Sequence, residues 1–338
     1  MQALATKYRP DDFDSVCSQD SIKKILLRQL QLKQFKNCYL FCGASGCGKT
    51  TLARIFANRI NDGVGSPIEI DGASNNGVDN VKTIIKSAQE RSIDSKYKIY
   101  IIDECHALSN AAWQAFLKCI EEPPTYTIFI FCTTDPQKIP ATILNRVQRF
   151  NFCRVDQESI KKRLAYICEQ EGFTNYIDSV DYISRICNGG VRDAIALLDK
   201  CAGYSNDLSI NNVLESLGNY SYDVAFDLVN AIIDGDETKV IKIIEDYYST
   251  GHDLKVFIDS FFEFILDVSK YIIFKDCSVT KFPSSYKDKL DNSVNFKDAD
   301  KYYSYILDRI LELRNMLKED TTIKSTVEVY LLKLARCQ

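Results

Sequence analysis

The stretch that decides the fold of this 338-residue chain is Tyr39-Leu40-Phe41-Cys42-Gly43-Ala44-Ser45-Gly46-Cys47-Gly48-Lys49-Thr50. Its four apolar residues predict a buried strand, and the run from Lys49 to Arg59 has the apolar spacing of a helix. The loop between them matches the pattern GxxxxGK[ST] in full. Glycines let the N–H groups of such a loop point inward at a phosphate, and the positive end of the following helix strengthens the attraction. We therefore expect a phosphate-binding loop rather than a chance glycine turn.

A second element supplies the carboxylates that nucleotide hydrolysis needs. The apolar run that ends at Ile102 is followed directly by Asp103 and Glu104. With Lys49 on the β- and γ-phosphates and the Thr50 hydroxyl on Mg²⁺, Asp103 would support the metal and Glu104 would act as general base toward water. Paired acids after a strand can also be simple helix caps. Because a complete phosphate loop precedes them, we favour an ATP-hydrolysing site, whose other predicted contacts are Gly43, Ala44, Ser45, Gly46, Cys47, Gly48 and Thr51.

The surrounding pattern predicts an α/β domain followed by helical domains. Short strands alternate with helices up to about Phe152, which indicates a parallel sheet covered on both faces, and helical periodicity continues from Gln157 to the end. We place the α/β nucleotide-binding domain at residues 1–155, a small helical unit at 156–205 and a larger one at 206–338. The predicted strands are Tyr39–Cys42, Ile68–Ile70, Lys98–Ile102, Ile128–Cys132 and Arg149–Phe152, and the predicted helices of the first domain are Lys49–Arg59, Val78–Arg91 and Asn110–Ile120.

Composition excludes several classes of protein. With 46% hydrophobic and 26% charged residues, the chain is not dominated by disorder, and no apolar run is long enough to span a membrane. We therefore expect a cytoplasmic protein without a membrane partner. The 13 cysteines are scattered, no CxxC occurs and only two histidines are present, so we read most cysteines as small buried hydrophobic residues and expect no zinc. The net charge is −4, so contact with nucleic acid would depend on local patches.

Four further stretches carry a resemblance to a known family. They are Lys7-Tyr8-Arg9-Pro10 with Phe13, Ile70-Asp71-Gly72-Ala73-Ser74, the DECHALS box at 103–109 that leads to EEPP at 121–124, and TTDPQKIP at 133–140. Over residues 4–204 the chain resembles the clamp-loader ATPases of the AAA+ class, in particular the gamma/tau subunits of bacterial DNA polymerase III. The resemblance implies an AAA+ sheet domain, a helical lid and a helical collar. It also implies ATP hydrolysis that opens a sliding clamp and loads it onto primer-template DNA, within a five-subunit ring of this chain or of several subunits.

The resemblance assigns roles to residues that spacing leaves anonymous. Tyr8, Arg9 and Pro10 match the segment that lines the adenine pocket, which would otherwise read as a turn. Thr134 matches a sensor near the γ-phosphate. Arg146 matches the arginine finger that acts on a neighbour's ATP, with Arg149 as its rival. Arg192 matches the second sensor, although it could instead pair with its neighbour Asp193.

The resemblance also bears on DNA contact and on zinc. The DNA candidates are Asn75, Asn76, Lys82, Lys86 and Asn110, in a segment less basic than the family usually shows, and a solvated helix face explains them equally well. The interval at 61–67 is too short for the family's cysteine-ligated zinc module. Two other functions stay open: another AAA+ ATPase of recombination or repair, and a scaffold that binds ATP without hydrolysing it. Polymerase chemistry is not expected, because no second acidic cluster suits two metals.

Overall fold

The computed structural model describes residues 2–218, 221–318 and 322–336. The chain forms two compact units. The first runs up to Arg163 and includes Cys187–Ala196, and the second comprises Leu164–Ile186 and the chain from Leu197 onward. Helices α7 (Gln157–Glu171) and α9 (Val191–Tyr204) each contribute residues to both units. The three-domain division expected from the sequence stays a prediction.

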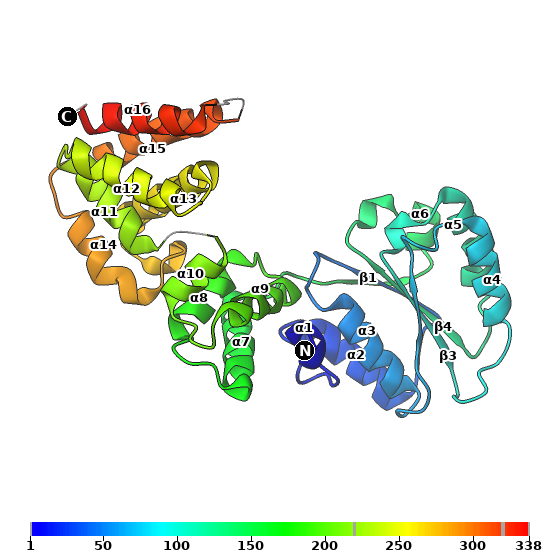
Figure 1. The fold of residues 1–338 in the computed structure, drawn as a ribbon. Coiled ribbons are helices and arrows are strands. Elements are labelled where there is room, and N and C mark those ends of the chain that lie inside the picture. The colour runs from blue at the N-terminus through cyan, green and yellow to red at the C-terminus, as the bar shows by residue number, and fades with distance from the viewer. Residues whose placement is uncertain (1, 219–220, 319–321, 337–338) are drawn as a thin grey trace. The chain divides into compact units, whose positions relative to one another are not determined.

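The first unit is built on a five-stranded sheet in which every pairing is parallel (Figure 1). The strand order is β2-β3-β4-β1-β5, so β1 lies between β4 and β5. The α/β prediction and its five strands are confirmed. The strands are β1 (Cys38–Cys42), β2 (Ile68–Asp71), β3 (Lys98–Asp103), β4 (Thr127–Thr133) and β5 (Gln148–Asn151), and the helices are α1 (Leu4–Lys7), α2 (Asp20–Leu32), α3 (Lys49–Ile60), α4 (Val78–Ala88), η1 (Cys105–Ala107), α5 (Asn110–Glu121), η2 (Pro136–Lys138) and α6 (Ala141–Leu144).

Alternating side chains on the central strands fill two separate cores. Tyr39 and Phe41 of β1 join the core that also holds Phe56 of α3, whereas Leu40 between them joins the core that holds Trp113 of α5. Because successive side chains of a strand point to opposite faces, an unbroken apolar run identifies a strand covered on both sides. Because β1, β3 and β4 run parallel, their carboxyl ends lie at one edge of the sheet, where the polar motifs follow.

Helix α4 ends earlier than the sequence predicts. The periodicity continues to Arg91, but the helix ends at Ala88. Side chains from neighbouring strands bond to the carbonyl groups at its end: Lys98 Nζ donates to the Ser87 oxygen at 2.7 Å and Thr127 Oγ1 to the Ala88 oxygen at 2.8 Å. These donors satisfy the carbonyls that a helix end leaves without partners, so tertiary contacts override the local pattern here.

In the described residues of the second unit, all regular secondary structure is helical apart from one isolated bridge, Thr174–Asp207. Its main core lies where α13 packs on α15, with Phe257, Phe261 and Tyr303 fully buried. A cluster of aromatic rings continues this core, in which Tyr222 lies 4.8 Å from Phe282 between ring centres. The elements are α8 (Ile177–Ile186), α10 (Ile210–Ser216), α11 (Tyr222–Ile233), α12 (Glu237–Ser249), α13 (Leu254–Phe274), η3 (Cys277–Val279), η4 (Ser284–Tyr286), α14 (Lys287–Ser293), α15 (Ala299–Met316) and α16 (Ile323–Arg336).

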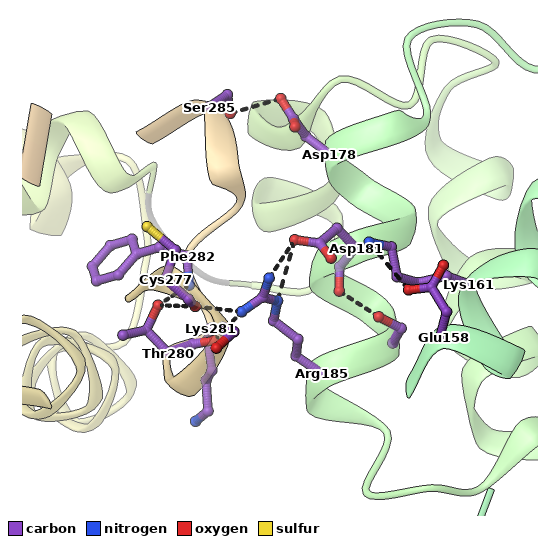
Figure 2. A network of polar contacts seen from close by, with 12 residues as sticks. Glu158, Lys161, Asp178, Asp181, Arg185, Cys277, Thr280, Lys281, Phe282 and Ser285 are labelled. Atoms are coloured by element: carbon purple, nitrogen blue, oxygen red, sulfur yellow. Dashed lines mark hydrogen bonds and ion pairs between the residues drawn. The ribbon is translucent and has the colours of Figure 1, made fainter. Parts of the chain in front are cut away.

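A buried arginine fastens α8 to the segment after α13 (Figure 2). Arg185 donates to Asp181 Oδ2 from Nη2 at 2.8 Å and from Nε at 3.2 Å. Its Nη1 donates to the backbone oxygens of Cys277 at 2.5 Å and Thr280 at 2.6 Å. The side chains of Arg185 and Asp181 are only 9% and 8% exposed, so this is a desolvated ion pair within the second unit. Helix α8 is thereby held to residues 277–280.

Among the described residues, no helix has both the length and the apolar character that a membrane span needs.

Candidate nucleotide-binding site

The loop between β1 and α3 has the backbone shape of an anion cradle. Gly46 has φ +71°, and an added Cβ there would come within 3.1 Å of the Gly190 Cα, so a side chain would be both strained and crowded. Lys49 is 6% exposed, and its Nζ donates to the backbone oxygens of Gly43 and Ala44, each at 2.9 Å. An ammonium group has three protons, which leaves one for an incoming anion. The loop therefore holds a buried positive charge at its centre.

The acids expected after β3 lie beside this loop. Thr50 Oγ1 donates to Asp103 Oδ2 at 2.7 Å, and the Glu104 amide donates to Asp103 Oδ1 at 3.0 Å. Because the Thr50 proton points at a carboxylate, the lone pairs of its oxygen are free to face a cation. This donor arrangement fits Mg²⁺, which prefers oxygen ligands and takes few of them from the protein when phosphates supply the rest. No group of three His, Cys, Asp or Glu side chains suited to a metal occurs among the described residues.

An open cleft of about 920 Å³, counting its mouth, joins the loop to the N-terminal segment. Within the first unit, the predicted residues that line it are Tyr8, Arg9, Pro10, Ser45, Gly46, Cys47, Gly48, Lys49, Thr50, Thr51, Asp103, Glu104 and Arg192. Gly43 and Ala44 do not line it, although their carbonyls hold Lys49.

The cleft is electropositive. Burial and the positive charge of Arg54 lower the pKa of Arg9, with a further contribution from Arg192 that Glu69 and Asp103 oppose. Two guanidinium groups and Lys49 thus share one cleft. A polyanion would relieve their mutual repulsion, so the electrostatics favour a nucleotide phosphate chain.

The predicted sensor and finger residues lie in different places. Thr134 does not line the cleft, but its Oγ1 donates to Glu104 Oε2 at 3.0 Å, so it contacts the expected general base. Arg192 lies in the first turn of α9 and lines the cleft, and in the described chain no ion pair joins it to Asp193. The role of Arg192 as the second sensor stays a prediction.

Arg146 and Arg149 both lie outside the cleft. Arg146 follows α6, its Nη2 lies 2.7 Å from Glu121 Oε1, and its side chain is 38% exposed. Arg149 is on the edge strand β5, where its Nε donates to Asn151 Oδ1 at 2.8 Å. A residue that acts on a neighbouring subunit must lie away from its own cleft, so both positions agree with a role in trans, which stays a prediction.

The DNA candidates gather at the N-termini of α4 and α5 and on the exposed side of α4. The Ser109 amide donates to the Asn76 oxygen at 3.1 Å, which ties the two N-termini together, and Asn110 is the first residue of α5. Asn75 bonds back to the Asp71 oxygen. Lys82 lies 3.5 Å from Asp79, and both Lys82 and Lys86 are exposed. The arrangement places these groups at one edge without testing whether they bind DNA.

Sequence reasoning missed several cleft residues, of which Arg163 adds a third guanidinium. Its Nη2 donates to the Tyr8 oxygen at 2.5 Å, across 155 residues of chain. No motif surrounds it, and the only signal is a basic residue on a helix predicted to follow the sheet. The other missed lining residues are Ala5, Val16, Cys17, Val191 and Ile195, all small or apolar.

Comparisons with known proteins agree with the resemblance. Residues 66–156 match the family model described as DNA polymerase III, delta subunit, and residues 208–338 match that of DNA polymerase III subunits gamma and tau domain III. The chain is 35% identical over 292 residues to the tau subunit of Bacillus subtilis, covering 80% of this chain and 52% of that protein. It is 30% identical over 356 residues to the gamma subunit of Buchnera aphidicola, covering 98% of each.

Two further comparisons bear on length and fold. The gamma/tau subunit of Mycoplasma genitalium is 29% identical over 337 residues, covering 93% of this chain and 56% of that one, so the chain spans about half the length of several curated relatives it matches. Among solved structures, the Thermotoga maritima RuvB Holliday junction branch migration motor matches with a TM-score of 0.53 at 20% identity, over 67% of this chain and 80% of that one. At that identity the likeness concerns the fold alone, and it agrees with the predicted parallel α/β sheet domain followed by helices.

Proposed function

Because the chain belongs to the family of DNA polymerase III gamma and tau subunits, we propose that it is an ATP-hydrolysing subunit of a clamp loader. The observation that carries the proposal is the conjunction of Lys49, the Thr50–Asp103 pair and Glu104 in one electropositive cleft. A subunit that only bound ATP would need the first two features and not a carboxylate placed for water. The scaffold alternative is therefore disfavoured, and the RuvB likeness adds nothing specific to recombination.

Eight of the residues that line the cleft have a part in the proposed reaction. Lys49 would direct its remaining proton at a phosphate oxygen, and Arg192 and Arg9 would balance the negative charge of the phosphate chain. Tyr8 and Pro10 would pack against the base. Thr50 and Asp103 would hold Mg²⁺, which when bound neutralises phosphate charge. Glu104 Oε1 would accept the proton of the attacking water while Oε2 stays bonded to Thr134.

The family suggests the setting of this reaction. We propose that the chain takes its place in a five-membered ring of like or related subunits, where Arg146 of one subunit completes the ATP site of its neighbour. The proposed partners of that ring are a sliding clamp and primer-template DNA, and the proposed location is the cytoplasm. Backbone contact through the N-termini of α4 and α5 would read the shape of DNA and not its bases.

The decisive experiment replaces the general base. We expect Glu104→Gln to keep ATP affinity and to lower the rate of phosphate release by about 10²–10⁴-fold, the usual contribution of a positioned base. The matched control is Glu90→Gln, an exposed glutamate outside the cleft, with an unchanged rate. Assays with and without primed DNA and the cognate clamp test the setting. Equal rates for Glu104→Gln and the control would remove Glu104 from the mechanism, and indifference to the clamp would favour another AAA+ function.

A further inference from the structure

His106 makes a contact that the proposed hydrolysis does not yet use. It lies in the short helix η1, directly after the expected general base, and its Nδ1 is 3.2 Å from Glu104 Oε2. The same carboxylate oxygen accepts the Thr134 hydroxyl at 3.0 Å. On the far side, His106 Nδ1 lies 3.3 Å from Thr133 Oγ1, a side chain with no exposed surface. One ring nitrogen thus stands between the base and the end of β4.

We propose that His106 is a positioning residue for Glu104, holding Oε2 so that Oε1 faces the water that attacks ATP. This inference rests on the proposed ATPase function and assigns one more residue to it. In the described structure Oε1 has no protein partner, whereas Oε2 has two. A carboxylate anchored through one oxygen keeps the other available as a proton acceptor in a fixed direction, which is what general-base catalysis requires.

The chemistry of imidazole makes this contact selective. With a proton on Nδ1, His106 donates to Glu104 Oε2. Without it, Nδ1 can only accept from Thr133, and two lone pairs then face each other across 3.2 Å. Thr133 Oγ1 already accepts the Asp135 amide at 3.0 Å, so its oxygen has a partner whichever way its own proton points. The Nδ1–H tautomer therefore satisfies Glu104, and the other tautomer leaves it with Thr134 alone.

The main chain around Glu104 is held in place, so the direction of its carboxylate depends on contacts of the side chain. Glu104 itself has φ +45°, and its carbonyl accepts the Ala107 amide at 2.9 Å. Gly72 packs so closely that an added Cβ would lie 2.9 Å from the Glu104 oxygen and 2.8 Å from the Asp103 oxygen. Because the main chain is fixed on both sides, rotation of the side chain is the remaining freedom. Thr134 and His106 are the two donors that restrict it.

Substitutions of His106 that place a hydrogen-bond donor at Nδ1, at Nε2 or at neither position test this role. The amide nitrogen of His106→Asn can occupy the place of Nδ1, that of His106→Gln reaches instead toward Nε2, and His106→Leu offers no donor. We expect the Gln and Leu variants to lose about 10- to 100-fold in kcat, the worth of one hydrogen bond to a charged group. The Asn variant should stay within a few-fold of the unaltered chain. Affinity for ATP, measured by equilibrium binding, should be unchanged in all three.

The outcomes separate this inference from the proposed function. A purely structural role would lower kcat in the Asn variant as much as in the Leu variant, or would weaken ATP binding, and either result would overturn the inference alone. A faster rate in the Leu variant would also overturn it, because His106 would then restrain Glu104. Absence of turnover by the unaltered chain, with clamp and primed DNA present, would overturn the proposed function and the inference together. Circular dichroism of each variant shows whether it is folded, and the Gln variant, which keeps a polar side chain of similar reach, decides the matter should Leu unfold.

Discussion

Removing the guanidinium of Arg185 should lower the local free energy of opening of α8. The loss should be larger than the loss from breaking an exposed ion pair of the second unit. The change is Arg185→Met, which keeps an unbranched apolar stem and deletes four hydrogen bonds: two to Asp181 Oδ2 and one each to the carbonyls of Cys277 and Thr280. Figure 2 shows all of them converging on one side chain. What remains is a carboxylate 8% exposed without its guanidinium partner.

The loss of stability in Arg185→Met depends on which of the groups that lose a hydrogen bond can bind water instead. Four hydrogen bonds with a charged donor, at about 1.5–3 kcal/mol each, would sum to about 6–12 kcal/mol. That sum is too large, because Ser278 and Val279 are exposed and the two carbonyls can regain water through a small shift of their segment. The buried carboxylate cannot, and breaking a buried pair by removing one partner typically costs about 3–5 kcal/mol. We therefore expect a loss of about 3–5 kcal/mol in the local free energy of opening.

Native-state hydrogen exchange measures this quantity without assuming that the whole chain unfolds in one step. Amides of α8 and of residues 277–282 should exchange roughly a hundred to several thousand times faster in Arg185→Met, since every 1.4 kcal/mol is tenfold. The matched control is Arg336→Met. Arg336 also forms a two-pronged pair, with Glu237 at 2.7 and 2.8 Å, but its side chain is 66% exposed, so the loss should stay below about 1 kcal/mol.

A double variant separates the charge from the shape. Asp181→Asn together with Arg185→Met removes both charges, so no buried carboxylate is left without the guanidinium and part of the protection should return. The reasoning is refuted if Arg185→Met speeds exchange of α8 no more than Arg336→Met speeds exchange of α16. It is also refuted if the double variant exchanges as fast as Arg185→Met or faster, because no protection would then have returned.

Three other predictions concern the first unit and the metal content. Mixing Arg146→Ala with Lys49→Ala subunits should restore ATPase activity in trans, and no recovery at any ratio would point to a role in cis or to Arg149. Hydrogen bonds from the side chains of Ser18 and Ser159 and from the Ser159 amide lower the pKa of Asp156 to about 2. This contribution to stability is complete above the ordinary value of 3.8 and is lost as the pH falls toward 2, so Asp156→Asn should flatten the acid limb of a stability curve between about pH 4 and pH 2. Elemental analysis should find no stoichiometric zinc, and one zinc per chain would contradict the reading of the 61–67 interval.

The central residues of the site could be predicted from the sequence because they directly follow strands. The fold brings the ends of these strands together. Lys49 and Thr50 follow β1, and Asp103 and Glu104 complete and follow β3. In a parallel sheet these ends lie at one edge, so a pattern read along the chain becomes a cluster in space. Tyr8 and Arg192 have no such signal. They were assigned through the family resemblance, and the structure places both in the cleft.

The features that the sequence could not predict depend on contacts between residues that are far apart along the chain. Arg163 reaches Tyr8 from a helix that carries no motif, and α4 ends where Lys98 and Thr127 take its last carbonyls. The geometry around His106 is of the same kind. His106 contacts Glu104, which is two residues away in the sequence, but its second neighbour, Thr133, comes from β4. Only the assembled sheet reveals that the three groups form one chain of contacts.

Backbone contacts also link the proposed DNA edge to the proposed base. The Gly72 amide donates to the Asp103 oxygen at 2.7 Å, and the turn that begins there carries Asn75 and Asn76. Asn76 in turn accepts the Ser109 amide, which closes a loop around Glu104. A phosphate held at this edge would act on backbone segments that are hydrogen-bonded to those that flank Glu104. Under the proposed function, DNA bound at this edge would change the rate of hydrolysis through these contacts to the main chain of Asp103 and Ser109, on either side of Glu104.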